Sequence, residues 1–345
     1  MTLLYFIIIL GVIILVHEFG HFIFAKKAGI YVYEFSIGMG PRIFKWTRKN
    51  DETEYSIRLI PIGGFVQMAG EEIDDDETVP KDKKFSVKTF GQKFMTVIAG
   101  IMNNFILAII LLFIYALFNG APQSEVYVGQ LQSDMPAYTS GLQTGDKILK
   151  INGKNASNID LFTLEYQVNV GKTLDITVER NNQILDVNVS PKKVVTDGEE
   201  TYKYGFTYTS EVKTGFLASL NYAFTKTFNI VWQMVLIICY LVTGHLGLAS
   251  LSGPVGIFNI VGEAANSGIW QLVTLTALLS VNVGFINLLP LPAFDGGRLL
   301  FVIIEKIKGK PVDPRFENTI HSIGFFLLMI LMLLITYNDI IRIIK

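Results

Sequence analysis

Four apolar stretches in this 345-residue chain are each long enough to cross a lipid bilayer as a helix. They lie within residues 1–24, 94–118, 269–297 and 319–337. Half of the residues are hydrophobic and only 17% are charged, which is more apolar surface than one water-soluble core would bury. The sequence therefore predicts a polytopic α-helical membrane protein with four transmembrane helices, surrounded by the lipid bilayer. A net charge of −1, without a strongly basic tract, argues against nucleic acid as a partner.

A fifth apolar stretch, residues 216–247, supports two interpretations. In its first half, polar side chains recur every four residues and would form one stripe along a helix. The stripe consists of Asn221, Thr225, Asn229 and Gln233. This pattern favours an amphipathic helix that lies in the membrane interface. The second half, residues 234–243, is apolar all round, as in a helix that crosses the membrane.

The loop between the first two spans, residues 25–93, is rich in positive charge. It contains twelve Lys and Arg residues, whereas the segment before the first span contains none. By the positive-inside bias, we expect this loop in the cytoplasm. Residues 31–44 and 55–68 within it are rich in β-branched and aromatic residues and are interrupted by Gly and Pro, so we expect strands or hairpins there. The acidic run at 74–77 is expected to be a solvated linker.

A soluble insert at residues 124–210 has the pattern of a small β-rich domain. Apolar and polar residues alternate at 173–179 and 184–189, and Asn152-Gly153 is a turn signal. Because one membrane crossing separates this insert from the cytoplasmic loop, we expect it on the extracytoplasmic side.

The first span contains the pentapeptide His17-Glu18-Phe19-Gly20-His21, an H-E-x-x-H pattern. On a helix, residues four apart lie on one face, so both imidazoles can bind a single Zn²⁺. Glu18 lies beside them, where it can accept a proton from the water that the metal activates. At about 1.5 Å per residue, His17 would lie roughly 20 Å along the helix, inside the hydrocarbon layer. Ionisable groups at that depth are costly unless paired or bound to metal, which favours zinc over two structural histidines and a buried carboxylate.

Two histidines leave a catalytic zinc site one protein ligand short, because such sites commonly have three. The best candidate is Asp295, which follows Pro290 and Pro292 at the end of the third span. These prolines break the helix, and irregular backbone at membrane depth is tolerated only where it is buried in protein or lines a wet cavity. The remaining histidines, His245 and His321, lie at the ends of apolar segments and are interpreted as interfacial residues.

The pairing of Asp295 with His17 also tests the topology. His17 lies toward the cytoplasmic end of its span, so Asp295 must lie near the cytoplasm too. The third span must then run inward from the side of the β-rich insert, and residues 216–247 cannot cross the membrane. The loop after Asp295 would be cytoplasmic, which agrees with its five Lys and Arg residues.

With these motifs identified, the chain resembles the bacterial site-2 proteases, of the regulator-of-sigma-factor type with an inserted PDZ domain. The resemblance covers nearly the whole chain, and residues 141–153 resemble the PDZ segment of this family. The other matching segments are 17–21, 61–68 (PIGGFVQM), Ala99-Gly100 with Asn104, 252–256 (SGPVG) and 287–297 (NLLPLPAFDGG).

The resemblance implies a site of four residues. His17, His21 and Asp295 would hold zinc, and Glu18 would be the catalytic base. A peptide bond inside a helix hides its carbonyl in a hydrogen bond, so the substrate must unwind before it is cut. A strand edge can replace those hydrogen bonds.

The resemblance also implies substrate-binding residues. A strand-like region at Gly63 and Gly64 would re-enter the membrane and pair with extended substrate. Asn287 would help to hold that substrate, or it is a turn residue before the prolines. In a circularly permuted PDZ domain, residues Tyr204-Gly205-Phe206 would form the carboxylate-binding loop, or Gly205 is an ordinary glycine at a strand edge.

The expected function is that of a zinc-dependent intramembrane endopeptidase in the bacterial cytoplasmic membrane. Its substrates would be single-span membrane proteins, such as anti-sigma factors or signal-peptide remnants, cut in regulated intramembrane proteolysis. The PDZ-like domain would recognise the trimmed extracytoplasmic end of a substrate. A noncatalytic scaffold would not need both histidines and Glu18, and a metal transporter would need ionisable residues along several spans. The sequence does not indicate an oligomeric state.

Overall fold

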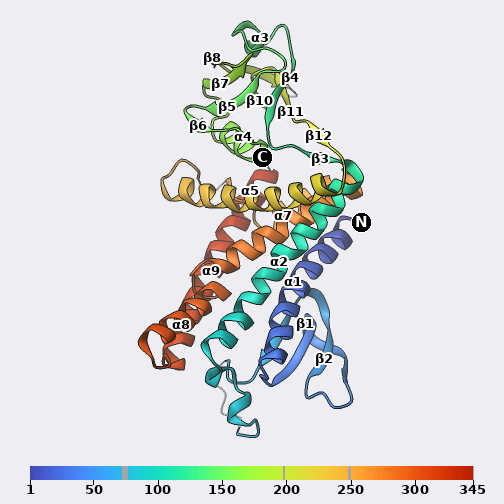
Figure 1. Cartoon of the computed structure of the whole chain (residues 1–345), viewed down its shortest axis with the longest axis vertical. Coiled ribbons are helices and arrows are strands. Elements are labelled where there is room, and N and C mark those ends of the chain that lie inside the picture. The colour runs from blue at the N-terminus through green and yellow to red at the C-terminus, as the bar shows by residue number, and fades with distance from the viewer. Residues whose placement is uncertain (72–76, 197–198, 248–249, 345) are drawn as a thin grey trace. The chain divides into compact units, whose positions relative to one another are not determined.

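The computed structural model of the protein describes residues 1–71, 77–196, 199–247 and 250–344 (Figure 1). Most of the acidic run expected as a linker at 74–77 lies outside these ranges. The chain divides into two compact units, residues 1–111 with 248–345 and residues 112–247. Five helices among the described residues are long and apolar enough to cross a membrane, which fits a polytopic membrane protein with a β-rich region. These are α1 (Thr2–Lys27), α2 (Phe90–Asn119), α5 (Phe216–Val242), α7 (Ile269–Leu288) and α9 (Pro314–Ile344).

The first unit is a helical bundle with one small sheet. Ile9 and Ile13 of α1 are buried against Val261 and Leu272, which belong to α6 and α7. Near the other end of α1, Ala25 packs in a second apolar cluster with residues of α2 and α8. The remaining helical elements of this unit are η1 (Lys81–Lys83), η2 (Phe85–Val87), α6 (Pro254–Ser267) and α8 (Asp295–Lys308).

The motif at 252–256 begins α6 and is held by α9. Asp339 of α9 is only 1% exposed, and its carboxylate accepts a hydrogen bond of 2.8 Å from the Gly256 N–H. Gly253, the N-cap residue, has no capping side chain, and a Cβ there would come within 2.9 Å of the Asp339 carboxylate. Asp339 therefore supplies, from a distant helix, the anion that a helix N-terminus favours.

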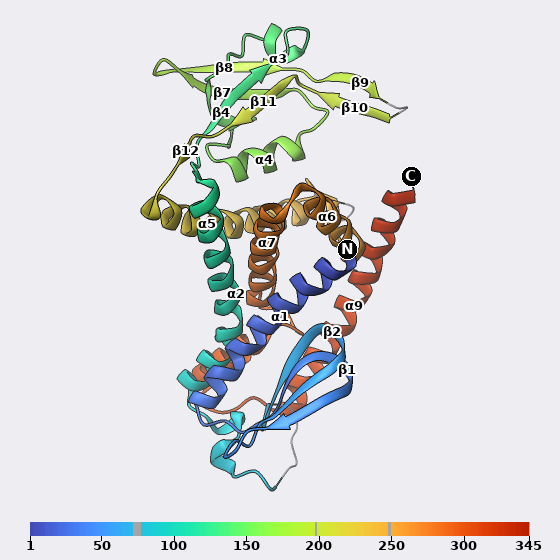
Figure 2. The same ribbon diagram turned by 90° about the vertical axis from the view of Figure 1, so that its right-hand side faces the viewer.

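The sheet of the first unit lies alongside α1, as Figure 2 shows, and consists of β1 (Val32–Thr47) and β2 (Glu54–Met68). Both strands bend, so β1 residues 34–37 pair with β2 twice, once with residues 64–67 and once with residues 54–57. The bends coincide with Gly38, Gly40 and Gly63, whose positive φ angles suit glycine. The resulting order of segments is 42–47, 54–58, 32–37 and 64–68. Among the described residues, segment 64–68 pairs on one side only and forms an edge.

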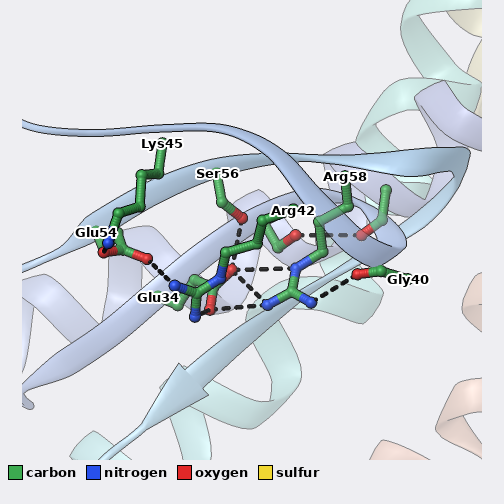
Figure 3. Close-up of polar contacts among 9 residues, drawn as sticks. Glu34, Gly40, Arg42, Lys45, Glu54, Ser56 and Arg58 are labelled. Carbon is green, nitrogen blue, oxygen red and sulfur yellow. Dashed lines mark hydrogen bonds and ion pairs between the residues drawn. The ribbon is translucent and has the colours of Figure 1, made fainter.

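A network of charged side chains around the buried Glu34 connects the bent segments of the sheet (Figure 3). Glu34 is 3% exposed, and its carboxylate accepts hydrogen bonds from Ser56 Oγ (2.5 Å), Arg58 Nη2 (2.8 Å) and Arg42 Nη2 (2.8 Å). Arg58 also donates to the carbonyl of Gly40 at 2.8 Å. Burial alone would raise the pKa of Glu34, but the hydrogen bonds from Ser56 and Arg58 and the charges of both arginines lower it.

The second unit contains the β-rich region that we expected in the insert. Its main sheet has the order β11-β4-β5-β7-β8, and β6 pairs with β5. The strands are β4 (Val126–Leu131), β5 (Lys147–Ile151), β6 (Lys154–Asn155), β7 (Leu174–Arg180), β8 (Gln183–Val189) and β11 (Phe206–Thr209). Short helices α3 (Pro136–Thr139) and α4 (Ile159–Val168) accompany this sheet. Two further pairs are β9 (Lys192–Thr196) with β10 (Glu199–Lys203), and β3 (Ala121–Pro122) with β12 (Val212–Lys213).

Helix α5 belongs to the second unit and is docked on α4. Lys226 forms an ion pair with Asp160, and Gln233 donates to the Asp160 carbonyl at 3.2 Å. Tyr240, near the end of α5, donates to Glu165 and accepts from Lys154 at 2.7 Å. Gln233 of the predicted polar stripe therefore contacts α4, and the other three residues of the stripe line a cavity together with Asp160.

Candidate metal centre and active site

Helix α1 presents His17 and His21 one turn apart, with both imidazoles buried. Their Nε2 atoms lie 3.1 Å from each other. Asp295, the first residue of α8, points its Oδ2 atom at both: 2.9 Å from Nε2 of His17 and 3.2 Å from Nε2 of His21. The structure thus brings together the three side chains predicted as metal ligands, from two distant parts of the sequence.

The donor set suits a zinc ion. Three atoms spaced about 3 Å apart can all lie roughly 2 Å from one point, which is the bond length of zinc to imidazole nitrogen and carboxylate oxygen. Asp295 Oδ2 is buried and has no hydrogen-bond partner of good geometry among the described residues. A buried, unsatisfied carboxylate oxygen is costly unless a cation meets it. No other group of three or more His, Cys, Asp or Glu side chains with this geometry occurs in the described ranges.

The far nitrogens of both imidazoles are held by α2. His21 Nδ1 lies 2.8 Å from the carbonyl of Thr96, so it carries the proton and leaves the Nε2 lone pair for a metal. His17 Nδ1 lies 3.2 Å from Nδ2 of Asn104, while Asn104 Oδ1 is buried without a partner in the described chain. The oxygen and nitrogen atoms of an asparagine side-chain amide are distinguished by the hydrogen bonds that they make. With the Asn104 amide turned over, Oδ1 accepts from His17 Nδ1 and the His17 Nε2 lone pair is also free for the metal.

Glycines allow α1 and α2 to approach closely here. A Cβ at Gly20 would collide with the backbone of Ala99, and a Cβ at Gly100 would occupy the space of the His21 ring. Asn103 of α2 donates to the Val16 carbonyl at 3.0 Å. The sequence Ala99-Gly100 therefore makes room for an imidazole between two packed membrane helices.

Glu18 is half-buried on the side of α1 that faces the edge of the sheet. A Cβ built on Gly64 would lie 3.8 Å from Glu18 Cγ and 2.6 Å from the Ser36 carbonyl, so glycine keeps this position open. Gly63 has φ +93°, which places the bend just before this edge. Glu18 of α1 therefore lies beside Gly64 at the edge of the sheet, directly after the bend at Gly63.

The loop between α7 and α8 positions Asp295. A Cβ at Gly296 or Gly297 would clash with the backbone of Leu288 or Leu291, so both glycines are needed where the first turn of α8 packs on this loop. Ala293, two residues before the aspartate, has a positive φ of 75°. The carboxylate is thus presented by a tightly folded loop that contains two prolines.

The other predicted residues are not members of this cluster of ligand atoms. Asn287 donates to the Val283 carbonyl of its own helix at 3.0 Å. Tyr204 is 1% exposed, and its hydroxyl donates to the carbonyls of Asn169 and Lys172. Gly205 has φ +86°, and Phe206 begins β11 and packs on α4. His245 bonds to Thr243 within the second unit.

Besides the contact of Asn104 with His17, two contacts at the site were not predicted from the sequence. The Thr96 carbonyl is invisible to side-chain patterns, because every residue has one. The Ala293 N–H lies 3.0 Å from His321 of α9, a histidine that the sequence analysis assigned to the membrane interface. The only sequence signal for His321 is its position at the start of an apolar stretch.

The chain is similar over nearly its whole length to known proteases. Residues 5–331 match the family described as peptidase family M50. The chain is 33% identical to the zinc metalloprotease RasP of Oceanobacillus iheyensis, over 99% of each chain. It is 33% identical to the regulator of sigma-W protease RasP of Bacillus subtilis, over 99% of this chain and 98% of that protein. It is 36% identical to the probable protease eep of Enterococcus faecalis, over 99% of each.

These matches cover the chain from end to end, and they confirm the predicted family, the protease activity and the zinc cofactor. The chain belongs to peptidase family M50 and is a zinc metalloprotease of a bacterial membrane.

Proposed function

We propose that this protease holds its zinc with His17, His21 and Asp295, and that Glu18 is its catalytic base. The observation that carries this assignment is the convergence of three ligand atoms, each within 3.2 Å of the others, on an apolar helix with Glu18 beside them. Such a cluster would be costly in a membrane without a cation. The substrates would be transmembrane segments of single-span membrane proteins.

In this mechanism the residues of the protein bind the metal ion, orient the two imidazoles and transfer one proton. When bound, Zn²⁺ would polarise the scissile carbonyl and activate a water molecule. Glu18 takes a proton from the attacking water and later gives it to the leaving amine. The Thr96 carbonyl and the Asn104 amide keep His21 and His17 in the tautomer that offers Nε2 inward.

The edge segment 64–68 is the proposed substrate-binding strand. An unwound substrate can add to this edge by main-chain hydrogen bonds, which places its backbone beside Glu18. Membrane entry of the sheet is supported by Gly11, whose Cβ would lie 3.2 Å from the Pro61 carbonyl, two turns before His17. Several apolar side chains near the bends are exposed, as expected for contact with lipid. They are Met39, Ile43, Phe44, Leu59 and Ile60.

Four membrane spans, α1, α2, α7 and α9, are the proposed topology. Contacts with the β-rich region run along α5 from Lys226 to Tyr240, which is about 21 Å of helix. A helix covered by a water-soluble domain over that length cannot lie across the hydrocarbon layer. This supports the interfacial position of α5 and the inward direction of α7.

The β-rich region of residues 124–210 is proposed to be a PDZ-like domain on the extracytoplasmic side. Strand β11 is at one end of the sheet order and lies against Phe162 and Tyr166 of α4. Its other edge pairs with no strand among the described residues, so it is suited to bind an extended peptide, with Tyr204-Gly205-Phe206 at the start of the strand. The name of the Bacillus subtilis relative points to an anti-sigma factor as one substrate; signal-peptide remnants are a second class.

The test is a comparison of membrane proteomes from cells that contain either the wild-type protein or the Glu18→Gln variant. Single-span fragments should accumulate in the variant, and their uncut membrane segments identify the substrates. Identical proteomes would reject the proposed substrate class.

A further inference from the structure

The loop that carries Asp295 contains a backbone conformation that its sequence does not favour. Ala293 has φ +75°, in the left-handed region that a residue with a Cβ rarely adopts. It follows Pro292 and precedes Asp295 by two residues. Such a conformation persists only where the surrounding structure holds it in place.

The group that holds it is His321, from the first turns of α9. The Ala293 N–H donates to His321 Nδ1 at 3.0 Å, and the His321 ring lies 5.7 Å from the ring of Phe301. A ring nitrogen accepts only when it carries no proton, so this bond requires a neutral imidazole with its proton on Nε2. His321 Nε2 is buried and has no hydrogen-bond partner in the described part of the chain.

A second position on the same face of α9 supports the contact. Gly324 lies three residues after His321, and a Cβ there would clash with Pro292 and lie 3.0 Å from its carbonyl oxygen. Glycine lets α9 approach until the imidazole reaches the Ala293 N–H. Helix α9 therefore contacts two consecutive loop residues: Gly324 packs closely on Pro292, and His321 accepts a hydrogen bond from Ala293.

We propose that His321 is a positioning residue of the metal site, which fixes the turn at Ala293 so that Asp295 points at His17 and His21. This inference rests on the proposed role of Asp295 as a zinc ligand. His321 itself does not contact the reacting atoms. Residues that orient metal ligands from outside typically change metal affinity by about 10–100-fold when they are replaced.

Substitutions that move or remove the hydrogen-bond acceptor at position 321 distinguish a positioning role from simple packing. In His321→Asn, the side-chain oxygen can take the place of Nδ1 and accept from the Ala293 N–H. In His321→Gln the oxygen reaches one bond further, and in His321→Leu there is no acceptor. A packing role would treat the similarly sized Leu and Gln side chains at least as well as Asn.

The experiment measures zinc release from the purified full-length protein to an excess of chelator, in a Glu18→Gln background that prevents turnover. His321→Leu and His321→Gln should release zinc at least about tenfold faster than the parent, and His321→Asn within about threefold of it. Thr319→Ala is the matched control, because Thr319 is exposed and, among the described residues, its side chain bonds only to the Arg315 carbonyl of its own helix. It should release zinc at the parental rate.

Two results would overturn the inference: parental release from the Leu and Gln variants, or release from Asn as fast as from Gln. If the Leu variant does not fold, the Asn and Gln pair decides alone. Asp295→Asn is measured in parallel. Fast release from Asp295→Asn with parental release from all His321 variants rejects only the role of His321, whereas parental release from Asp295→Asn rejects the ligand set itself.

Discussion

Asp295 Oδ2 lies 2.9 Å from His17 Nε2, although the two residues belong to helices near opposite ends of the chain. The contact forms because α8 begins at a loop folded tightly against the end of α7, with Gly296 and Gly297 at the points of closest approach. The position of Asp295, the proposed third ligand, therefore depends on the packing of this loop.

Replacing Asp295 with Ala should remove most of the bound zinc, because two imidazoles alone leave the site one ligand short. The purified wild-type protein should contain about one zinc per chain by elemental analysis. Asp134→Ala, an exposed aspartate in the second unit, is the control and should keep its zinc. Wild-type zinc content with full cleavage in Asp295→Ala would reject this ligand.

Asn104 should affect zinc binding through the orientation of His17. Asn104→Asp keeps an oxygen that can accept from His17 Nδ1, whereas Asn104→Leu keeps the volume but removes the acceptor. We expect the Leu variant to bind zinc about 10–100-fold more weakly in a competition with a chelator. The Asp variant should bind within a few-fold of wild type, and equal affinities for Leu and wild type would contradict the role of Asn104.

The topology prediction concerns both ends of α5. Single cysteines at Thr214 and His245, in a Cys239→Ser background, occupy exposed positions that flank the helix. If α5 lies in the interface, an impermeant thiol reagent should label both from the extracytoplasmic face. Labelling of the His245 position only from the cytoplasm would mean that α5 crosses the membrane.

The site was largely predictable because its chemistry is local. The H-E-x-x-H spacing places His17, His21 and Glu18 by helical geometry alone, and the proline-rich end of the third span narrows the choice of the third ligand to Asp295. Thr96, Asn104 and His321 contact the candidate site from other helices, and these contacts depend on how α2 and α9 pack. Sequence periodicity carries no information on such contacts.

The main helices and strands were predictable from the sequence, but several of the contacts between them were not. Apolar length identified α1, α2, α7 and α9, and β-branched patterns identified the sheet between α1 and α2. The double pairing of β1 follows from bends at several glycines, which a strand pattern does not reveal. The sequence predicts the polar stripe of α5 from its four-residue spacing, but this spacing could not show that Gln233 of the stripe contacts Asp160 of α4.

The Glu34 network should make the stability of the protein depend on pH. The pKa of Glu34 is lower in the folded protein than its ordinary value, so the unfolded chain binds more protons in acid. The contribution of Glu34 is therefore complete above the unfolded pKa, near 4.5, and is lost as the pH falls toward the lowered folded value.

Glu34→Gln should cost on the order of 2 kcal/mol at pH 7, because Arg42 and Arg58 lose their shared carboxylate. This is less than for a fully buried pair, since both arginines are partly exposed. Melting temperatures in detergent between pH 3 and 7 provide the measurement. The difference between wild type and variant should shrink in acid, and a difference that stays constant with pH would contradict the predicted titration.

The most direct measurement for the central claim combines zinc content with cleavage in Glu18→Gln. Glutamine has nearly the shape of glutamate but cannot accept the proton of the attacking water. The variant should keep about one zinc per chain, co-purify with uncut single-span proteins, and cleave a model transmembrane substrate at least about 100-fold more slowly. Cleavage by this variant at a rate near that of the wild type would contradict both the role of Glu18 and the proposed mechanism.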